Sequence, residues 1–112
     1  MTRLPAVPKD VLSICYDEDY LNKHQEYIAT CELVWHHDAE IIRRSIQDEL
    51  QAQSDYESRA DDVVHPLARK VLLDVANEEK VHQYEFLEVL RQIDRFQNMA
   101  ENRAKKEIRE MD

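Results

Sequence analysis

Residues 72–86 read LLDVANEEKVHQYEF and carry an apolar stripe with the spacing of an α-helix. Leu72, Val75, Glu79, His82 and Phe86 follow one another at intervals of three and four residues, which places them on one helix face. Two polar residues therefore stand in the middle of a stripe that should turn inward. Because Glu79 and His82 are three residues apart, their side chains point at the same spot.

The preceding part of the chain carries a second stripe with the same spacing. Its members are Trp35, Ala39, Ile42, Ile46, Glu49, Gln53, Tyr56 and Ala60. Between the two stripes the polar residues 57–65 predict a turn, and Pro66 suits the first position of the second helix. Such a short connection makes the two helices antiparallel neighbours, with Glu49 opposite Glu79 and His82.

The composition favours an all-α fold. The chain has 112 residues with no Gly and only three Pro, which excludes Gly-rich phosphate loops and dinucleotide-binding fingerprints. We divide it into an N-terminal arm and helix (1–34), a helical hairpin (35–96) and a polar C-terminal helix or tail (97–112). The first prolines predict an extended arm up to about Asp10, and the spacing from Tyr20 predicts a helix. An unbroken helix over residues 19–60 would be about 60 Å long, which is awkward for so small a chain, so we expect a break near His36–Asp38, where Asp38 can cap.

The charge and the cysteine content indicate which partners and which cellular compartment to expect. A formal charge of −9 disfavours nucleic acid as a partner, and neither a signal peptide nor a membrane-spanning run is predicted. We therefore expect a cytoplasmic protein that does not bind membranes, with Cys15 and Cys31 reduced. We expect His24 to be a core or interface residue, and the sequence assigns no role to the two cysteines, His36 or His37.

The polar centre of the stripes predicts a metal site. Buried carboxylates that face one another are costly without a positive charge, and neither stripe supplies Lys or Arg. A divalent cation would supply that charge, and carboxylate plus imidazole suits iron or manganese. Di-iron bundles use a Glu from each of two helices and a Glu-x-x-His from each of the other two. Glu49, Glu79 and His82 are half of that set, so two chains would complete it, with Tyr56 two turns from Glu49.

Two other interpretations stay open on these residues. In one, the ion fixes a helical dimer and catalyses nothing, and zinc or manganese would serve as well as iron. In the other, the chain is an acidic helical adaptor without a metal, which requires Glu49 and Glu79 to be exposed to solvent.

Residues 46–50 (IQDEL) with Tyr56, and residues 72–87, resemble the encapsulated ferritins of the rubrerythrin-like group. The resemblance covers about Ile41 to Asp94. It implies an antiparallel half-ferritin hairpin that completes a four-helix bundle on dimerisation, here with additional N- and C-terminal helices. It also implies ferroxidase activity, the oxidation of Fe(II) to Fe(III) in iron storage or detoxification, at a di-iron centre shared between two chains.

By this resemblance Glu49, Glu79 and His82 are metal ligands and Tyr56 is the nearby tyrosine, so these four are the candidate catalytic residues. The family further implies a ring of dimers, a decamer, inside an encapsulin shell. The chain departs from the family at its last residues, 105–112 (KKEIREMD), which lack the Gly and apolar residues of a docking peptide. Gln51 also stands where a second carboxylate can occur, whereas Asp48 fits.

Overall fold

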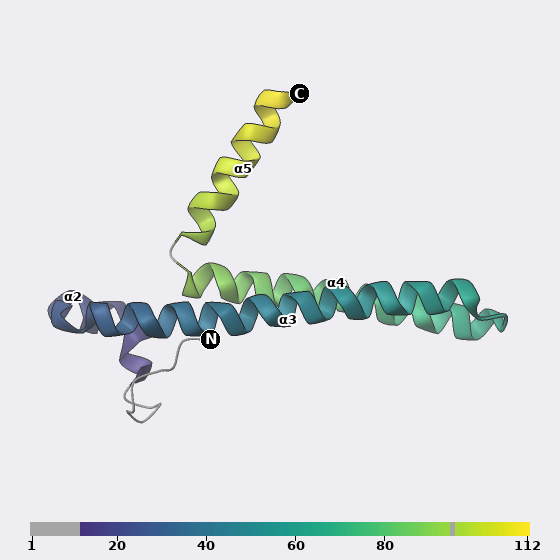
Figure 1. The fold of residues 1–112 in the computed structure, drawn as a ribbon, viewed down its shortest axis with the longest axis horizontal. Helices are drawn as coiled ribbons and strands as arrows, with labels where there is room; N and C mark the ends of the chain where they lie inside the picture. Colours follow the sequence, from purple (N-terminus) through teal and green to yellow (C-terminus); the bar gives the residue numbers. More distant parts are fainter. Residues whose placement is uncertain (1–11, 95) are drawn as a thin grey trace. The chain divides into compact units, whose positions relative to one another are not determined.

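The computed structural model describes residues 12–94 and 96–112, and these residues form helices and their connections (Figure 1). The elements are the 3₁₀ helix η1 (Ser13–Tyr16), α2 (Glu18–Lys23), the 3₁₀ helix η2 (Gln25–Tyr27), α3 (Ile28–Asp62), α4 (Pro66–Ile93) and α5 (Gln97–Met111). The predicted all-α class is confirmed for this part of the chain. The predicted arm up to Asp10 lies outside the described residues. None of the described helices has the length and apolarity needed to cross a membrane.

α3 is one continuous helix of 35 residues, so the predicted break near His36–Asp38 is wrong. At about 1.5 Å per residue it is about 53 Å long. Its sequence contains neither Gly nor Pro, so no residue interrupts the backbone hydrogen bonds. Asp38 does not cap a helix; its carboxylate accepts a hydrogen bond from Tyr16 Oη at 2.6 Å.

The helix predicted from Tyr20 onward is interrupted before α3. His24 has φ −132° and ψ 62°, outside the helical region, and separates α2 from η2. At the start of α2, the Asp17 side chain accepts a hydrogen bond from the backbone N–H of Tyr20, as an N-cap does. His24 is not a core residue, because its side chain is 44% exposed and stacks on Tyr20 with ring centroids 4.3 Å apart.

Cys15 and Cys31 form a disulfide, so the expectation of two reduced thiols is wrong. η1 folds back against the start of α3 and brings the two Cα atoms to 5.2 Å, within the range of a disulfide. Both cysteines belong to a small core, and Trp35 Nε1 donates a hydrogen bond of 2.8 Å to the Cys15 carbonyl beside it. The buried members of this core are Leu12, Cys15, Leu21, Cys31 and Val34. The sequence separation of 16 residues gave no sign of this proximity, which depends on the turns around α2.

The chain divides into two compact units, one of which is Ile42–Val89. Within this unit, side-chain contacts join α3 to α4, and their sequence separation rises from 9 residues near the connection to 30 and 34 further along. Such a rise is typical of antiparallel segments. α4 begins at Pro66, as predicted, and Arg69 Nε donates to the Ala60 carbonyl at 3.0 Å next to the connection.

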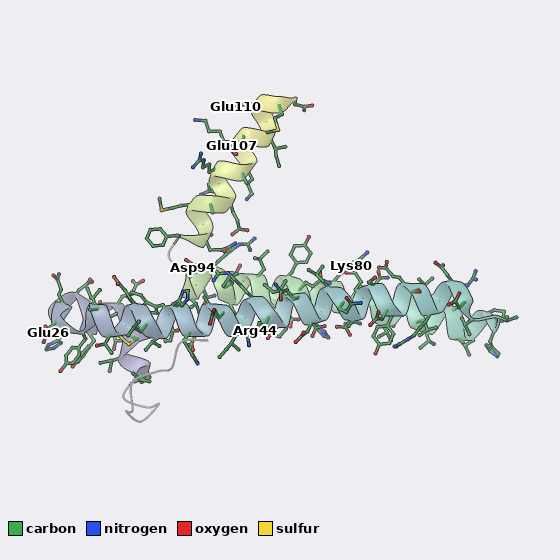
Figure 2. All side chains as sticks on the ribbon, viewed as in Figure 1. Glu26, Arg44, Lys80, Asp94, Glu107 and Glu110 are labelled. Carbon is green, nitrogen blue, oxygen red and sulfur yellow. A yellow bond between two sulfur atoms is a disulfide. The ribbon has the colours of Figure 1, made fainter. Side chains whose placement is uncertain are left out.

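Ile42–Val89 has almost no buried core of its own. The only buried hydrophobic residues in this unit, all of which the structure describes, are Ala60 and Ala76. Figure 2 shows side chains projecting along both helices, among them the exposed Arg44 and Lys80. The fully buried residues of this unit are therefore small, and larger apolar residues of the two stripes, such as Ile46, Leu72 and Phe86, are partly buried.

The other unit contains the described residues up to Ile41 together with Leu90–Asp112. The polar segment predicted as a helix or tail is the helix α5. A bidentate pair between the Arg91 guanidinium and the Glu101 carboxylate, with distances of 2.8 and 2.9 Å, joins the end of α4 to α5.

Candidate metal centre

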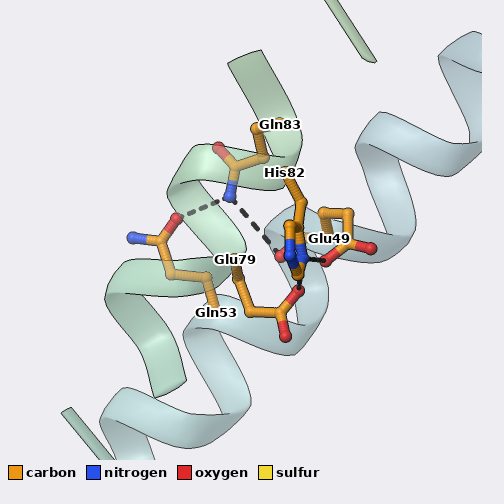
Figure 3. A network of polar contacts seen from close by, with 5 residues as sticks. All are labelled: Glu49, Gln53, Glu79, His82 and Gln83. Carbon is orange, nitrogen blue, oxygen red and sulfur yellow. Dashed lines mark hydrogen bonds and ion pairs between the residues drawn. The ribbon is translucent and has the colours of Figure 1, made fainter. Parts of the chain in front are cut away.

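Glu49 of α3 and Glu79 with His82 of α4 form a three-residue group within Ile42–Val89 (Figure 3). One ligand atom from each residue lies within 4.8 Å of the other two. Among the described residues this is the only group of three or more such side chains that could hold a metal ion. The structure thus brings together the three residues at which the predicted stripes turn polar.

His82 Nδ1 is the common neighbour of the two carboxylates. It lies 3.3 Å from Glu79 Oε2 and 3.4 Å from Glu49 Oε2. One ring nitrogen carries at most one proton, so it can donate fully to only one of these oxygens. A cation between the three atoms would instead meet two carboxylate oxygens and one nitrogen lone pair, which is a mixed oxygen and nitrogen donor set.

Glu49 Oε2 makes no hydrogen bond with the described residues, although His82 Nδ1 lies 3.4 Å from it. It is a buried oxygen atom, whereas its side chain as a whole is 24% exposed. A buried carboxylate oxygen that lacks a donor is unfavourable, and a bound cation would satisfy it. The donor set and this oxygen therefore fit a divalent metal ion.

The group is only partly shielded from water. The side chains of Glu79 and His82 are 15% and 42% exposed. The adaptor interpretation required Glu49 and Glu79 to be exposed, and both are instead partly buried. The open side of the imidazole leaves room for a further ligand or a second molecule.

Two glutamines beside the group were not recognised as interacting residues from the sequence. Gln83 Nε2 donates to Gln53 Oε1 at 2.7 Å and approaches the Glu49 carbonyl oxygen at 3.5 Å. Gln53 Nε2 in turn donates to Glu57 Oε1 at 2.7 Å. Gln53 belongs to the first stripe, but Gln83 lies beside the second one, so periodicity alone did not point to this pair.

Tyr56 lies on α3 as predicted, and the contact observed for its ring is with Arg59, whose guanidinium carbon is 5.4 Å from the ring centre. It is not part of the three-residue group. His37 lies elsewhere, 3.0 Å from Asp38, and His36 is exposed. Gln51, which lies outside the stripes, donates a hydrogen bond to Asp55 at 2.9 Å on an exposed face of α3.

The chain matches no protein-family model, no curated protein and no solved structure.

Proposed function

We propose that this chain is an iron-binding ferroxidase whose Fe(II) site is built by Glu49, Glu79 and His82 and is completed when two chains pair. The observation that carries the proposal is the convergence of three ligand atoms within 4.8 Å around a carboxylate oxygen that has no hydrogen-bond partner. The donors are two carboxylates and one imidazole, a set that suits Fe(II) and Mn(II) and also accommodates Zn(II).

The need for a second chain follows from the number of ligands and from the lack of a core. Three donors do not fill the coordination shell of Fe(II), and a two-fold partner would bring the set to four Glu and two His. Within Ile42–Val89 several large apolar side chains are exposed, which supports a partner that covers them. They are Leu50, Val64, Leu67, Val71, Leu73, Val81, Tyr84 and Val89.

Each residue has a defined role in this proposal. Glu49, Glu79 and His82 of each chain would hold iron, with Glu49 shared between the two chains and Glu79 and His82 serving the iron of their own chain. Fe(II) is the substrate: two ions each lose one electron, and the pair of electrons with two protons reduces dioxygen to hydrogen peroxide. Tyr56, seven residues after Glu49 on the same stripe, is proposed to hydrogen-bond a ligand carboxylate through its hydroxyl, without taking part in the electron balance. As in the family that the sequence resembles, dimers would assemble further into a ring.

The test is an anaerobic titration of the metal-free protein with Fe(II), followed by admission of oxygen. We expect about two irons per dimer, a rise in oligomer mass, and rapid Fe(III) formation. His82→Ala should abolish fast oxidation and leave the helix signal in circular dichroism nearly unchanged. Tyr56→Phe should slow oxidation without weakening Fe(II) binding. His36→Ala, an exposed histidine on the same protein, is the matched control.

The outcomes separate the proposal from its alternatives. Fe(II) binding without oxidation would assign the site to a metal-stabilised dimerisation module. Oxidation that is unchanged in His82→Ala would refute the site assignment, and absence of Fe(II) binding would refute the proposed function altogether.

A further inference from the structure

We propose that Gln53 and Gln83 act as a positioning pair, a clamp between α3 and α4 that holds the register in which Glu49, Glu79 and His82 converge. The inference rests on the proposed metal site. It assigns to two glutamines a role that the ligand set itself does not require.

The clamp is a directional chain of hydrogen bonds next to the candidate ligands (Figure 3). The carboxylate of Glu57 accepts from Gln53 Nε2, so Gln53 Oε1 faces α4 and accepts from Gln83 Nε2. The same Gln83 nitrogen lies 3.5 Å from the backbone carbonyl oxygen of Glu49. Gln83 directly follows His82 in sequence, and Gln53 lies one turn after Glu49. The clamp therefore connects the two helices at the level of the metal group.

Large apolar side chains give this register only partial support, because none of those within Ile42–Val89 is fully buried. Ala60 and Ala76, the buried hydrophobic residues of Ile42–Val89, are small and offer few interlocking surfaces. A slip of one residue along α4 moves a side chain by about 1.5 Å and turns it by about 100° around the helix axis. Such a slip would separate ligand atoms that now lie within 4.8 Å of one another. Polar pairs at helix interfaces are known to select one register at some cost in stability.

This role makes an unusual prediction, because stability and metal affinity should change differently. Replacing both members of a buried hydrogen-bonded pair by apolar side chains of similar shape is often neutral or stabilising. Groups that orient metal ligands without touching the metal typically affect metal affinity by roughly 10- to 100-fold. If the pair merely supported the fold, replacing it would lower both the stability and the metal affinity, or neither of them.

The experiment compares Gln53→Met/Gln83→Met with the wild-type chain, because methionine is close to glutamine in length and lacks the amide. Co(II) is the probe, titrated without oxygen and followed by its visible absorption, which reports both affinity and ligand geometry. We expect an unfolding midpoint in urea equal to or above that of the wild type, and a Co(II) Kd roughly 10- to 100-fold weaker with an altered spectrum.

Gln51→Met is the matched control. Gln51 is also a glutamine of α3 that donates to a carboxylate, Asp55, but it lies on an exposed face and does not contact α4 through that bond. Its Kd and spectrum should stay at wild-type values. Glu57→Met is a milder second variant, because it removes the acceptor that orients the Gln53 amide and leaves both glutamines in place.

The clamp variants are Gln53→Met/Gln83→Met and Glu57→Met. If one of them keeps the wild-type helix signal and also keeps the wild-type Kd for Co(II), the positioning role is overturned. A loss of affinity equal to that of Gln51→Met would overturn it as well. If the wild-type chain itself binds no Co(II) or Fe(II), the proposed function fails first. The two failures are therefore distinguishable.

Discussion

Substitution of Glu49 by Gln should stabilise the metal-free protein and at the same time remove its stabilisation by metal. The change keeps the length and shape of the side chain and removes one negative charge from the three-residue group. It also introduces an amide N–H₂ group, which can donate to the Glu79 carboxylate or to His82. The oxygen that now has no hydrogen-bond partner loses its charge.

The magnitude follows from the geometry. Ligand atoms of Glu49 and Glu79 lie within 4.8 Å, and both side chains are mostly shielded, at 24% and 15% exposure. At that distance, two unit charges repel by about 3 kcal/mol with an effective dielectric constant of about 20. Solvent reaches part of both side chains and screens this repulsion, so we expect the metal-free variant to be more stable by about 1–2 kcal/mol.

In the presence of metal, the wild-type protein should be more stable than Glu49→Gln, the reverse of their order without metal. A ligand present at 100 times its Kd stabilises the native state by about 2.7 kcal/mol, and the wild-type chain should gain this while Glu49→Gln gains little. Urea unfolding followed by circular dichroism, at neutral pH with and without Mn(II), measures both effects. With a urea m-value of about 1–3 kcal/mol/M, the metal-free midpoint should rise by roughly 0.3–2 M.

Glu78→Gln is the control for this comparison, because it removes the same charge from an exposed neighbour on α4. It should shift neither the metal-free midpoint nor the response to Mn(II) by a comparable amount. A metal-free Glu49→Gln protein less stable than the wild type would refute the reasoning, since it would show that Glu49 already has adequate partners in the absence of metal.

Two further predictions concern the unit that contains η1 and the start of α3. Reducing the Cys15–Cys31 disulfide reopens a loop with a sequence separation of 16 residues, which in the chain-entropy model lowers stability by about 3 kcal/mol. Fluorescence of Trp35, the single tryptophan, should report an earlier urea transition in reducing agent, and a Cys15→Ala/Cys31→Ala variant should not respond to the reductant. Burial, together with the hydrogen bond and charge of Asp38, raises the pKa of Tyr16 above its ordinary value of 10.0. The folded state therefore holds this proton more tightly, so the stability that Tyr16 contributes is complete below about pH 10 and declines as the pH rises further. Tyr16→Phe should show a smaller alkaline loss in urea unfolding measured from pH 8 to 11, and an equal loss would contradict the assignment.

The stripes in the sequence were sufficient to predict the helices α3 and α4 and the meeting of Glu49 with Glu79 and His82. Helical periodicity determines which residues share a face, and Pro66 marked the start of α4 correctly. Contacts that depend on tertiary geometry were not predictable in this way. The Cys15–Cys31 pair depends on how η1 and α2 turn, and the Gln83 bond to Gln53 depends on the rotation of α4 about its own axis.

The predicted break in α3 was wrong for a reason that bears on the candidate site. A helix of this length is unusual in so small a chain, yet a stable starting segment favours propagation, and α3 contains no Gly or Pro to interrupt it. The first turns of α3 have that stable segment, since Cys31 and Val34 are buried beside the disulfide. The residues of α3 that follow Ile42 have no comparable buried core, and their contacts to α4 include the polar pairs of Gln53 with Gln83 and of Glu49 with His82. Carboxylates and an imidazole can therefore lie where α3 and α4 meet within Ile42–Val89, because no large apolar side chain is fully buried there.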